Sequence, residues 1–388
     1  MRRGQHFVPA LRLFDGADSL AALHGELARV GSLRAVVFCG ASLVREGAAL
    51  DTVRRAMGDR CAGVFAGVKA HSPLDDVEVA VQELKRLRAD AVVAVGGGSA
   101  VVTARAASIL LAEPGDARDL CTVRNGDGAL FSPRLQAPKL AQLVVPTTPT
   151  TATLKAGSAV LDPVDGKRLA LFDPKTRAQA VFVHPDLLKT PPGTLVISAA
   201  LNTLAMALEG LMSLAGDPFS DGLLMHATRL IAQGLAGMGT SDEAAARSDL
   251  MFASLMCGHA TDYTGAGIAI PLGHAVSARF HVDNGFANAI LLPHVVRFNA
   301  QAAISGLAKL AAALGRPVRE ADPADAVIQA LDQLLEQLCA PRRLRDIGVT
   351  RASLPELAEI SMDDWFVQGN PRPVRDASEL LSVLTNAW

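Results

Sequence analysis

Residues 89–112 read ADAVVAVGGGSAVVTARAASILLA, and this stretch decides the fold. Its first part, 89–95, is a continuous run of Val and Ala, which is typical of a strand buried on both faces of a parallel sheet. Three glycines and Ser99 follow at once, and 100–112 is apolar enough to form a buried helix. We therefore predict a strand, a tight glycine turn and a helix, in that order.

The glycine turn predicts an anion-binding site. Gly97 and Gly98 allow the backbone to approach a ligand closely, because neither carries a Cβ atom. The helix that begins beside Ser99 offers free N–H groups and a partial positive charge, which suit a pyrophosphate. A plain tight turn is the alternative, but the strand–turn–helix context favours the phosphate site.

Outward from this stretch the first half of the chain alternates short β-rich runs with amphipathic helical stretches. Three further runs predict strands, at 32–39, 140–145 and 179–183, and 76–88 has its apolar residues at helical spacing. Strands separated by helices indicate a parallel, doubly wound, Rossmann-like sheet. We predict an α/β dinucleotide-binding domain.

A second polar loop follows the predicted strand at 140–145. It contains five threonines in eight residues, among them Thr147, Thr148 and Thr151. Ligands of doubly wound sheets bind outside the carboxyl ends of the strands, where this loop and the glycine turn both lie. The two loops therefore predict one shared ligand, with ordinary turn chemistry as the alternative.

The character of the sequence changes after 189–193, which reads KTPPG. Long Ala-, Leu- and Met-rich helical patterns follow, with few β-branched runs, at 198–214, 220–236, 241–259 and 325–338. We predict an all-helical domain and place the boundary near Pro191. The expected domains are an α/β dinucleotide-binding domain over 1–190 and an all-helical substrate domain over 191–388.

The bulk composition favours a cytoplasmic protein that acts on a small molecule. The formal net charge of −2 and the single tyrosine disfavour nucleic acid and anionic membranes as partners. No apolar stretch has the length or flanks of a signal peptide or a membrane span. The five cysteines form no CxxC pair, so reduced thiols and no cysteine metal site are expected.

Taken together, the motifs resemble the iron-containing alcohol dehydrogenase family, which is related to dehydroquinate synthase. The resemblance rests on the strand–GGGS–helix at 89–112, PTT at 146–148, PDL at 185–187, LNTLAMALE at 201–209 and GFANAILLPH at 285–294. It covers essentially the whole chain. The resemblance implies a nicotinamide-dependent oxidoreductase with the two-domain fold described above, and a homodimer.

Three details resemble the maleylacetate reductase branch of this family. The segment 71–73 reads HSP, similar to the branch's HTP, and places Ser72 among the cofactor-binding candidates. Asn202 stands where alcohol dehydrogenases carry a metal-binding Asp and maleylacetate reductases carry Asn. The segment 370–373 reads NPRP, as in that branch. Arg168 and Arg372 are candidates for binding phosphate or carboxylate groups, with surface ion pairs as the alternative.

The metal site departs from the family pattern. One Asp and three His hold the ion in metal-dependent relatives, and the matching positions here are Asn202, Met206, Ile270 and Asn284. First-row divalent ions need imidazole, carboxylate or thiolate donors, which these residues do not supply. We therefore predict no tightly bound catalytic metal.

Hydrogen-bond donors would then have to polarise the substrate carbonyl in place of a metal ion. The candidates are Asn202, Asn284 and His274, which matches a family histidine near the metal site that is not a ligand. A histidine also delivers the proton to the forming alkoxide. Tyr263 is a weaker candidate for the proton donor, and a packing role is the alternative for both His274 and Tyr263.

The cofactor loops also depart from the family. GGGSxxDxxK is replaced by GGGSAVVTAR, which brings Val102 and Arg105, and the threonine loop lacks the family's glycines and glutamate. NAD-preferring relatives have an Asp where Gly40 stands here, and Ser42 follows within bonding reach of a 2′-phosphate. The expected cofactor is NADPH or NADH, with NADP(H) favoured.

The leading hypothesis is a metal-independent, NAD(P)H-dependent reductase of an oxo acid or a related carbonyl or enone, similar to maleylacetate reductase. The first alternative is a non-redox lyase, cyclase or isomerase on the same scaffold. The second is a binding homologue that has lost catalysis. Cofactor binding separates the reductase from the binding homologue, and cofactor consumption separates it from the non-redox enzyme.

Overall fold

The computed structural model describes residues 6–125, 130–164, 166–316 and 322–388. The chain divides into two compact units between Pro191 and Pro192. The first is the α/β unit, Val8–Pro191. The second is the helical unit, which joins Pro192–Trp388 to the N-terminal residues up to Phe7.

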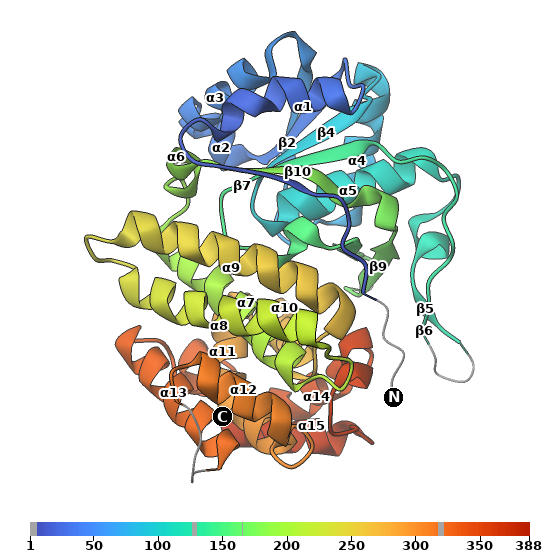
Figure 1. Ribbon diagram of the computed structural model, residues 1–388. Helices are drawn as coiled ribbons and strands as arrows, with labels where there is room; N and C mark the ends of the chain where they lie inside the picture. Colours follow the sequence, from blue (N-terminus) through green and yellow to red (C-terminus); the bar gives the residue numbers. More distant parts are fainter. Residues whose placement is uncertain (1–5, 126–129, 165, 317–321) are drawn as a thin grey trace. The chain divides into compact units, whose positions relative to one another are not determined.

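A six-stranded sheet with every pairing parallel forms the centre of the α/β unit (Figure 1). The strand order is β1-β10-β7-β4-β2-β3. The strands are β1 (Arg12–Asp15), β2 (Ala35–Gly40), β3 (Cys61–Val68), β4 (Ala91–Gly96), β7 (Ala141–Pro146) and β10 (Ala178–Val183). The predicted parallel sheet is confirmed, and β1 and β3 are additions to the four strands expected from the sequence.

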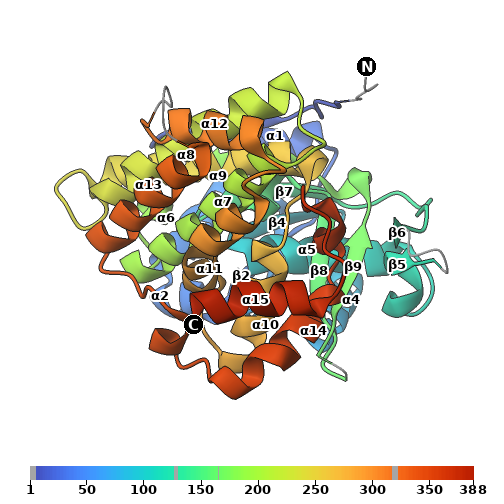
Figure 2. The same cartoon turned by 90° about the horizontal axis from the view of Figure 1, so that it is seen from below.

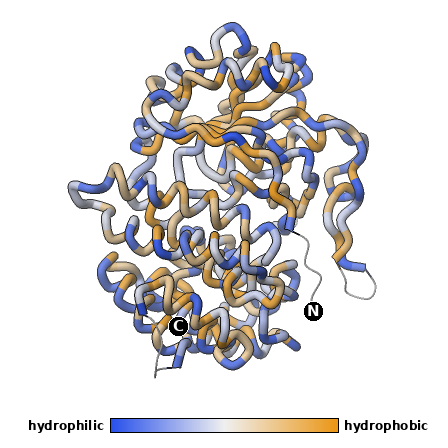
Figure 3. Tube along the Cα trace, viewed as in Figure 1, coloured by the Kyte–Doolittle hydropathy of each residue, from blue (hydrophilic) through white to orange (hydrophobic). Residues whose placement is uncertain are grey.

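Helices cover both faces of this sheet, so it is doubly wound. On one face α1 (Leu23–Arg29) and α3 (Ala48–Met57) pack against alternate strand residues such as Val37 and Val93. On the other face lie α4 (Leu74–Leu87) and α5 (Gly98–Ala112). Burial on both faces explains why the central strands are mainly apolar, as their colouring in Figure 3 shows.

Shorter elements complete the α/β unit. Two small antiparallel hairpins are formed by β5 (Val123–Arg124) with β6 (Leu130–Phe131), and by β8 (Gly157–Leu161) with β9 (Arg168–Phe172). Two short helices are α2 (Ala41–Glu46) and α6 (Pro185–Leu188). The β8–β9 hairpin matters for the site because it contacts α5.

The described part of the helical unit contains nine α-helices and no strand. They are α7 (Gly193–Met212), α8 (Pro218–Gly237), α9 (Glu243–Thr264), α10 (Ala269–Phe280), α11 (Asn284–Asn299), α12 (Ile304–Ala313), α13 (Pro323–Gln337), α14 (Leu354–Met362) and α15 (Ala377–Ala387). Figure 2 shows α7 and α11 surrounded by the other helices of this unit. The predicted all-helical C-terminal fold is confirmed.

Helix α7 is the core helix of this unit. Among the described residues it is the one helix long and apolar enough to cross a membrane by length and composition. However, 78% of its most apolar window is buried inside the protein. The hydrophobicity of α7 is therefore explained by its packing on α8, α9 and α11, because a helix surrounded by other helices is apolar on most of its surface.

Candidate active site

The glycine turn and the threonine loop lie side by side in the α/β unit. Their strands β4 and β7 are parallel neighbours, with Gly96 in register with Pro146. The N–H of Thr147 donates to the Gly96 carbonyl at 2.9 Å. The structure thus brings together the two polar loops that the sequence placed on one edge of the sheet.

The second and third glycines are required by the close approach of the threonine side chains. A Cβ on Gly97 would lie 2.6 Å from Thr148 Oγ1, and one on Gly98 would lie 2.9 Å from Thr150 Oγ1. Thr148 is buried, so its hydroxyl faces the turn and not bulk solvent. Hydroxyl groups and the first amides of α5 therefore meet at one point, and these donors fit a phosphate.

Arg105 stabilises the arrangement of the glycine turn and the threonine loop through hydrogen bonds. Its side chain is fully buried, and its guanidinium donates to the carbonyls of Ala152 at 2.8 Å and Gly157 at 2.6 Å. These bonds tie α5 to the end of the threonine loop and to β8. Arg105, at the position of the family's lysine, therefore stabilises the threonine loop through these two hydrogen bonds. The motif alone did not predict this role.

Ser72 supports the turn from the opposite side. Its side chain is buried, and its hydroxyl donates to the Ser99 carbonyl at 3.3 Å and accepts from Thr103 at 3.0 Å. The structure gives Ser72 a role in positioning the turn, because its hydroxyl is bonded within the protein. Arg168, at the start of β9, lies 3.5 Å from the ring of His71.

Neither the backbone conformation nor the packing around Gly40 requires a glycine at this position. Its φ of −79° suits any residue, and a Cβ there would make only ordinary contacts, the nearest at 3.6 Å from the Val68 carbonyl oxygen. Ser42, two residues further along in α2, is exposed. The end of β2 therefore has more free space with Gly40 than it would have with an acidic side chain at this position.

In the helical unit, three helices approach so closely that glycine is required at two contacts. A Cβ on Gly285 of α11 would lie 1.8 Å from the Ser198 carbonyl oxygen of α7. A Cβ on Gly273 of α10 would lie 1.7 Å from Asn288 Oδ1 of α11. Asn288 in turn donates to Asn202 Oδ1 of α7 at 2.9 Å. These contacts join the helices that carry Asn202, Met206, Ile270 and Asn284, the positions that match the family's metal ligands.

The resulting amide cluster consists of Asn202, Asn284 and Asn288. Asn288 is fully buried, and the sequence analysis did not single it out although it lies within the GFANAILLPH segment. Among the residues that the structure describes, Oδ1 of Asn284 and Oδ1 of Asn288 are buried without a hydrogen-bond partner. Buried polar atoms without partners are rare in folded proteins. Oδ1 of Asn288 lies against Gly273, so Oδ1 of Asn284 is the oxygen of the cluster left to accept from a ligand.

His274 of α10 is held by a carboxylate. Its Nδ1 lies 3.2 Å from Asp364 Oδ2, and both side chains are largely buried. The other oxygen of Asp364 accepts from the N–H of Phe366 at 2.9 Å, which fixes the carboxylate. An aspartate at Nδ1 orients the imidazole and stabilises its protonated form. Asp364 was missed because 90 residues separate it from His274.

Glu209 is a second buried acid in this region. Its Oε1 accepts from the N–H of Ala269 at 2.6 Å, at the start of α10. Burial raises the pKa of Glu209 to about 7, while the backbone bonds from Ala269 and its neighbours act in the opposite direction. Its other oxygen, Oε2, is buried without a partner in the described part of the chain. Glu209 therefore anchors the helix that carries His274.

The residues at the family's metal positions do not fit a metal ion. Met206 and Ile270 are almost completely buried, at 3% and 2% exposure, and offer a thioether and a hydrocarbon. Asn202 already accepts a hydrogen bond from Asn288. Within the described ranges no group of three or more His, Cys, Asp or Glu is arranged to hold a metal ion. The donor set is that of a hydrogen-bonding site.

Tyr263 is engaged elsewhere in the helical unit. Its hydroxyl donates to the carbonyl of Phe7 and accepts from the N–H of the same residue. Its ring stacks on His6 at 4.0 Å. The structure therefore gives Tyr263 a role in binding the N-terminal segment, and we do not retain it as a proton donor.

Comparison with known proteins identifies the family of this chain. A sequence profile described as iron-containing alcohol dehydrogenase matches residues 10–185. A second, described as the C-terminal part of the Fe-containing alcohol dehydrogenase family, matches 196–388. The chain belongs to the iron-containing alcohol dehydrogenase family. It is an oxidoreductase of that family.

Individual members are distant relatives that align over nearly the whole chain. The lactaldehyde reductase of Escherichia coli is 26% identical, covering 96% of this chain and 97% of its own. Maleylacetate reductase 1 of Cupriavidus pinatubonensis is 27% identical, covering 97% and 95%. The sulfoacetaldehyde reductase of Bifidobacterium kashiwanohense, solved with NAD⁺, shares the fold with a TM-score of 0.85 at 18% identity, covering 100% and 99%.

Proposed function

We propose that the protein is a metal-independent, NAD(P)H-dependent reductase of an oxo acid or a related carbonyl or enone, similar to maleylacetate reductase. One observation carries the proposal. The amide cluster includes Asn202 and Asn284, two positions at which the resemblance expects metal ligands, and Oδ1 of Asn284 is buried without a partner among the described residues. The His274–Asp364 pair involves α10, the helix that carries a third such position, Ile270. A site of this composition binds a polar substrate through hydrogen bonds.

The α/β unit supports the cofactor part of the proposal. The glycine turn, Ser99 and the hydroxyls of Thr147, Thr148 and Thr151 would hold the pyrophosphate of a dinucleotide. Gly40 and Ser42 favour NADPH over NADH, because no carboxylate stands there to repel a 2′-phosphate. A relative solved with NAD⁺ supports nicotinamide binding on this fold.

In the proposed reaction the nicotinamide supplies a hydride to the substrate carbon. Asn288 donates to Asn202 Oδ1, which leaves the NH₂ group of Asn202 to donate to the substrate carbonyl oxygen and polarise it. Protonated His274 transfers its proton to the forming alkoxide, and Asp364 stabilises the imidazolium before the transfer. Oδ1 of Asn284 would accept from a hydroxyl group of the substrate.

The substrate class follows from the relatives and the site together. Lactaldehyde reductase and maleylacetate reductase both reduce small oxygenated molecules, as their names state. The amide cluster offers both donors and acceptors, which a substrate with several oxygens requires. Maleylacetate is therefore the first substrate to test. We also propose a cytoplasmic homodimer.

The test is a nucleotide titration of protein dialysed against a chelator. NADPH and NADH are titrated separately and followed by nicotinamide fluorescence, while bound iron and zinc are measured in the same sample. Micromolar binding to metal-free protein, tighter for NADPH, supports the proposal. Stoichiometric metal that resists the chelator, or no binding of either nucleotide, contradicts it.

A further inference from the structure

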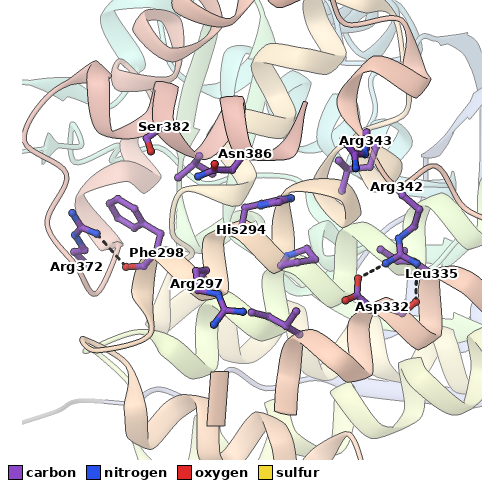
Figure 4. Close-up of a pocket in the computed structure, with 14 residues that line it drawn as sticks. His294, Arg297, Phe298, Asp332, Leu335, Arg342, Arg343, Arg372, Ser382 and Asn386 are labelled. Atoms are coloured by element: carbon purple, nitrogen blue, oxygen red, sulfur yellow. Dashed lines mark hydrogen bonds and ion pairs between the residues drawn. The ribbon is translucent and has the colours of Figure 1, made fainter. Parts of the chain in front are cut away.

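The helical unit contains a cavity of about 750 Å³ that the proposed reaction does not use. It lies between α11, α13 and α15 and is closed on two sides by the segments around Arg343 and Arg372 (Figure 4). Its apolar lining includes Ile290, Phe298 and Leu335. None of the lining residues belongs to the amide cluster or to the His274–Asp364 pair.

The charged lining of this cavity is strongly basic. Arg297, Arg342, Arg343 and Arg372 contribute four positive charges, and Asp332 is the one acid in the lining. Figure 4 shows Arg372 on one side of the cavity and Arg342 with Arg343 on the other. A cavity with cations at both ends and apolar side chains between them attracts anions that carry a charge at each end.

Acidic partners neutralise this basic lining only in part. Arg342 bonds to Asp332, Arg297 lies 2.6 Å from Asp325, and Arg372 lies 3.0 Å from Glu379. No carboxylate among the described residues forms an ion pair with Arg343. A guanidinium beside a cavity without such a pair has donors available for an anion.

The Arg372 end of the cavity is built rigidly. Asn370 exchanges two amide hydrogen bonds with Asn299 of α11, at 2.8 and 3.0 Å. The Arg372 guanidinium then stacks on Phe298, 3.9 Å from its ring centre. The NPRP segment is therefore fixed to α11, and the contact with Phe298 lowers the entropic cost of ordering this exposed arginine on a bound anion.

His294 lies on the floor of the cavity between the two groups of arginines (Figure 4). Burial lowers its pKa, and the charges of Arg297 and Arg343 lower it further, while Asp332 opposes them. Other cavity groups on α15, such as Ser382 and Asn386, carry no charge. His294 is therefore neutral at pH 7 in the absence of a bound anion.

We propose that this cavity is a binding site for a small organic dianion, in which two carboxylate or phosphate groups are joined by a short spacer. The arginines on the two sides bind the charged ends, and the apolar lining contacts the spacer. This is a second small-molecule site, separate from the one proposed for the nicotinamide reaction. It does not depend on that reaction.

The first test is calorimetric titration of the full chain at low salt with two probes, adipate and pyrophosphate. One saturable site is expected for at least one probe, and the tighter probe identifies carboxylate or phosphate as the preferred group. Arg343→Gln and Arg372→Gln should each weaken binding by about tenfold or more, because each removes charge-assisted hydrogen bonds. Arg375→Gln is the matched control, since Arg375 is exposed and outside the cavity lining.

Binding that is equally strong in Arg343→Gln, Arg372→Gln and the unchanged protein would place the anion elsewhere and overturn the proposal. No binding of either probe would also overturn it. A second readout is the NMR titration of His294, whose pKa should rise when the probe is bound and should need about tenfold more probe to rise in Arg343→Gln. An unchanged pKa of His294 at saturating probe contradicts binding in this cavity.

Discussion

The glycine-turn edge of the α/β unit and the amide cluster of the helical unit use different chemical groups as hydrogen-bond donors and acceptors. The first uses backbone amides and threonine hydroxyls, with Gly97 and Thr148 in close contact. The second uses carboxamide side chains and an Asp-oriented histidine. Substitutions around the first leave a site for phosphate groups, because the backbone still supplies donors. Substitutions in the second replace the ligand atoms themselves, because metal ligands are side chains, and the proposed metal-free chemistry rests on this difference.

The largest effect is expected at His274. His274→Ala removes the proposed proton donor, and kcat should fall by roughly 10²- to 10⁴-fold. NADPH affinity should stay the same, because His274 is assigned to the substrate reaction and not to the cofactor. Steady-state kinetics and a fluorescence titration measure the two quantities.

His24→Ala is the control for this variant, because His24 is exposed on α1. It should leave kcat unchanged. Asp364→Asn should retain the fold and lower kcat less than His274→Ala, with a shifted pH profile, since it removes only the group that orients the imidazole. Full activity of His274→Ala would remove this histidine from the mechanism.

A change at the glycine turn should act on cofactor binding. Gly97→Ala places a Cβ 2.6 Å from Thr148 Oγ1, so the threonine must move away from the turn. The dissociation constant for NADPH should rise by about tenfold or more, the order expected when one phosphate hydrogen bond is lost. Gly25→Ala is the control, because a Cβ at Gly25 meets no atom within 4 Å. Equal nucleotide affinity in both variants would contradict the assignment of the turn.

Gly40→Asp tests the basis of cofactor choice. The structure has room for the side chain, because the nearest contact of a Cβ is at 3.6 Å. The new carboxylate should repel a 2′-phosphate and bond the ribose hydroxyls, which shifts the NADPH-to-NADH affinity ratio towards NADH by about tenfold. Gly40→Ala adds the Cβ without the charge and should leave the ratio nearly unchanged. A ratio unmoved by Gly40→Asp would place the ribose elsewhere.

The smallest effect is expected at Glu209, and it is an effect on stability. Its pKa in the folded protein is about 7, raised above the ordinary 4.5. The folded state therefore holds the proton more tightly, so this contribution to stability is complete below pH 4.5 and is lost as the pH rises to about 7. Glu209→Gln should flatten the pH dependence of unfolding by urea across that window.

The matched control is Glu336→Gln, because Glu336 is exposed on α13. It should leave the pH dependence of unfolding as it is in the unchanged protein. If Glu209→Gln also leaves the slope unchanged between pH 5 and pH 7, the buried carboxyl does not carry the proton that its environment predicts.

The α/β fold was predictable from the sequence because its decisive signals are local. Strand β4, the glycine turn and α5 are contiguous, and the apolar run that defines β4 is a consequence of burial on both faces. Strand β3 was not predicted because Ala and Gly, which are depleted in strands, make up half of its sequence, CAGVFAGV. The edge strand β1 was not predicted because two of its four residues, Arg12 and Asp15, are charged and interrupt the apolar pattern of a strand.

The site was less predictable because its contacts join distant segments. Asn202 and Asn288 are 86 residues apart, and His274 and Asp364 are 90 apart. The resemblance identified Asn202, Asn284 and His274, but no spacing rule identifies Asp364. Tyr263 and Ser72 were assigned from alignment and motif, and their hydroxyls are bonded within the protein instead. Hydrogen-bond partners that lie far apart in the sequence can be identified only from the three-dimensional structure.

The central claim is that the helical unit performs its chemistry without a metal ion. The most direct measurement is the rate of NADPH oxidation with maleylacetate and a panel of oxo acids, using chelator-treated protein with and without added Fe²⁺ or Zn²⁺. The account predicts turnover by the metal-free protein, unchanged by either ion. Turnover that appears only after an ion is added would contradict it.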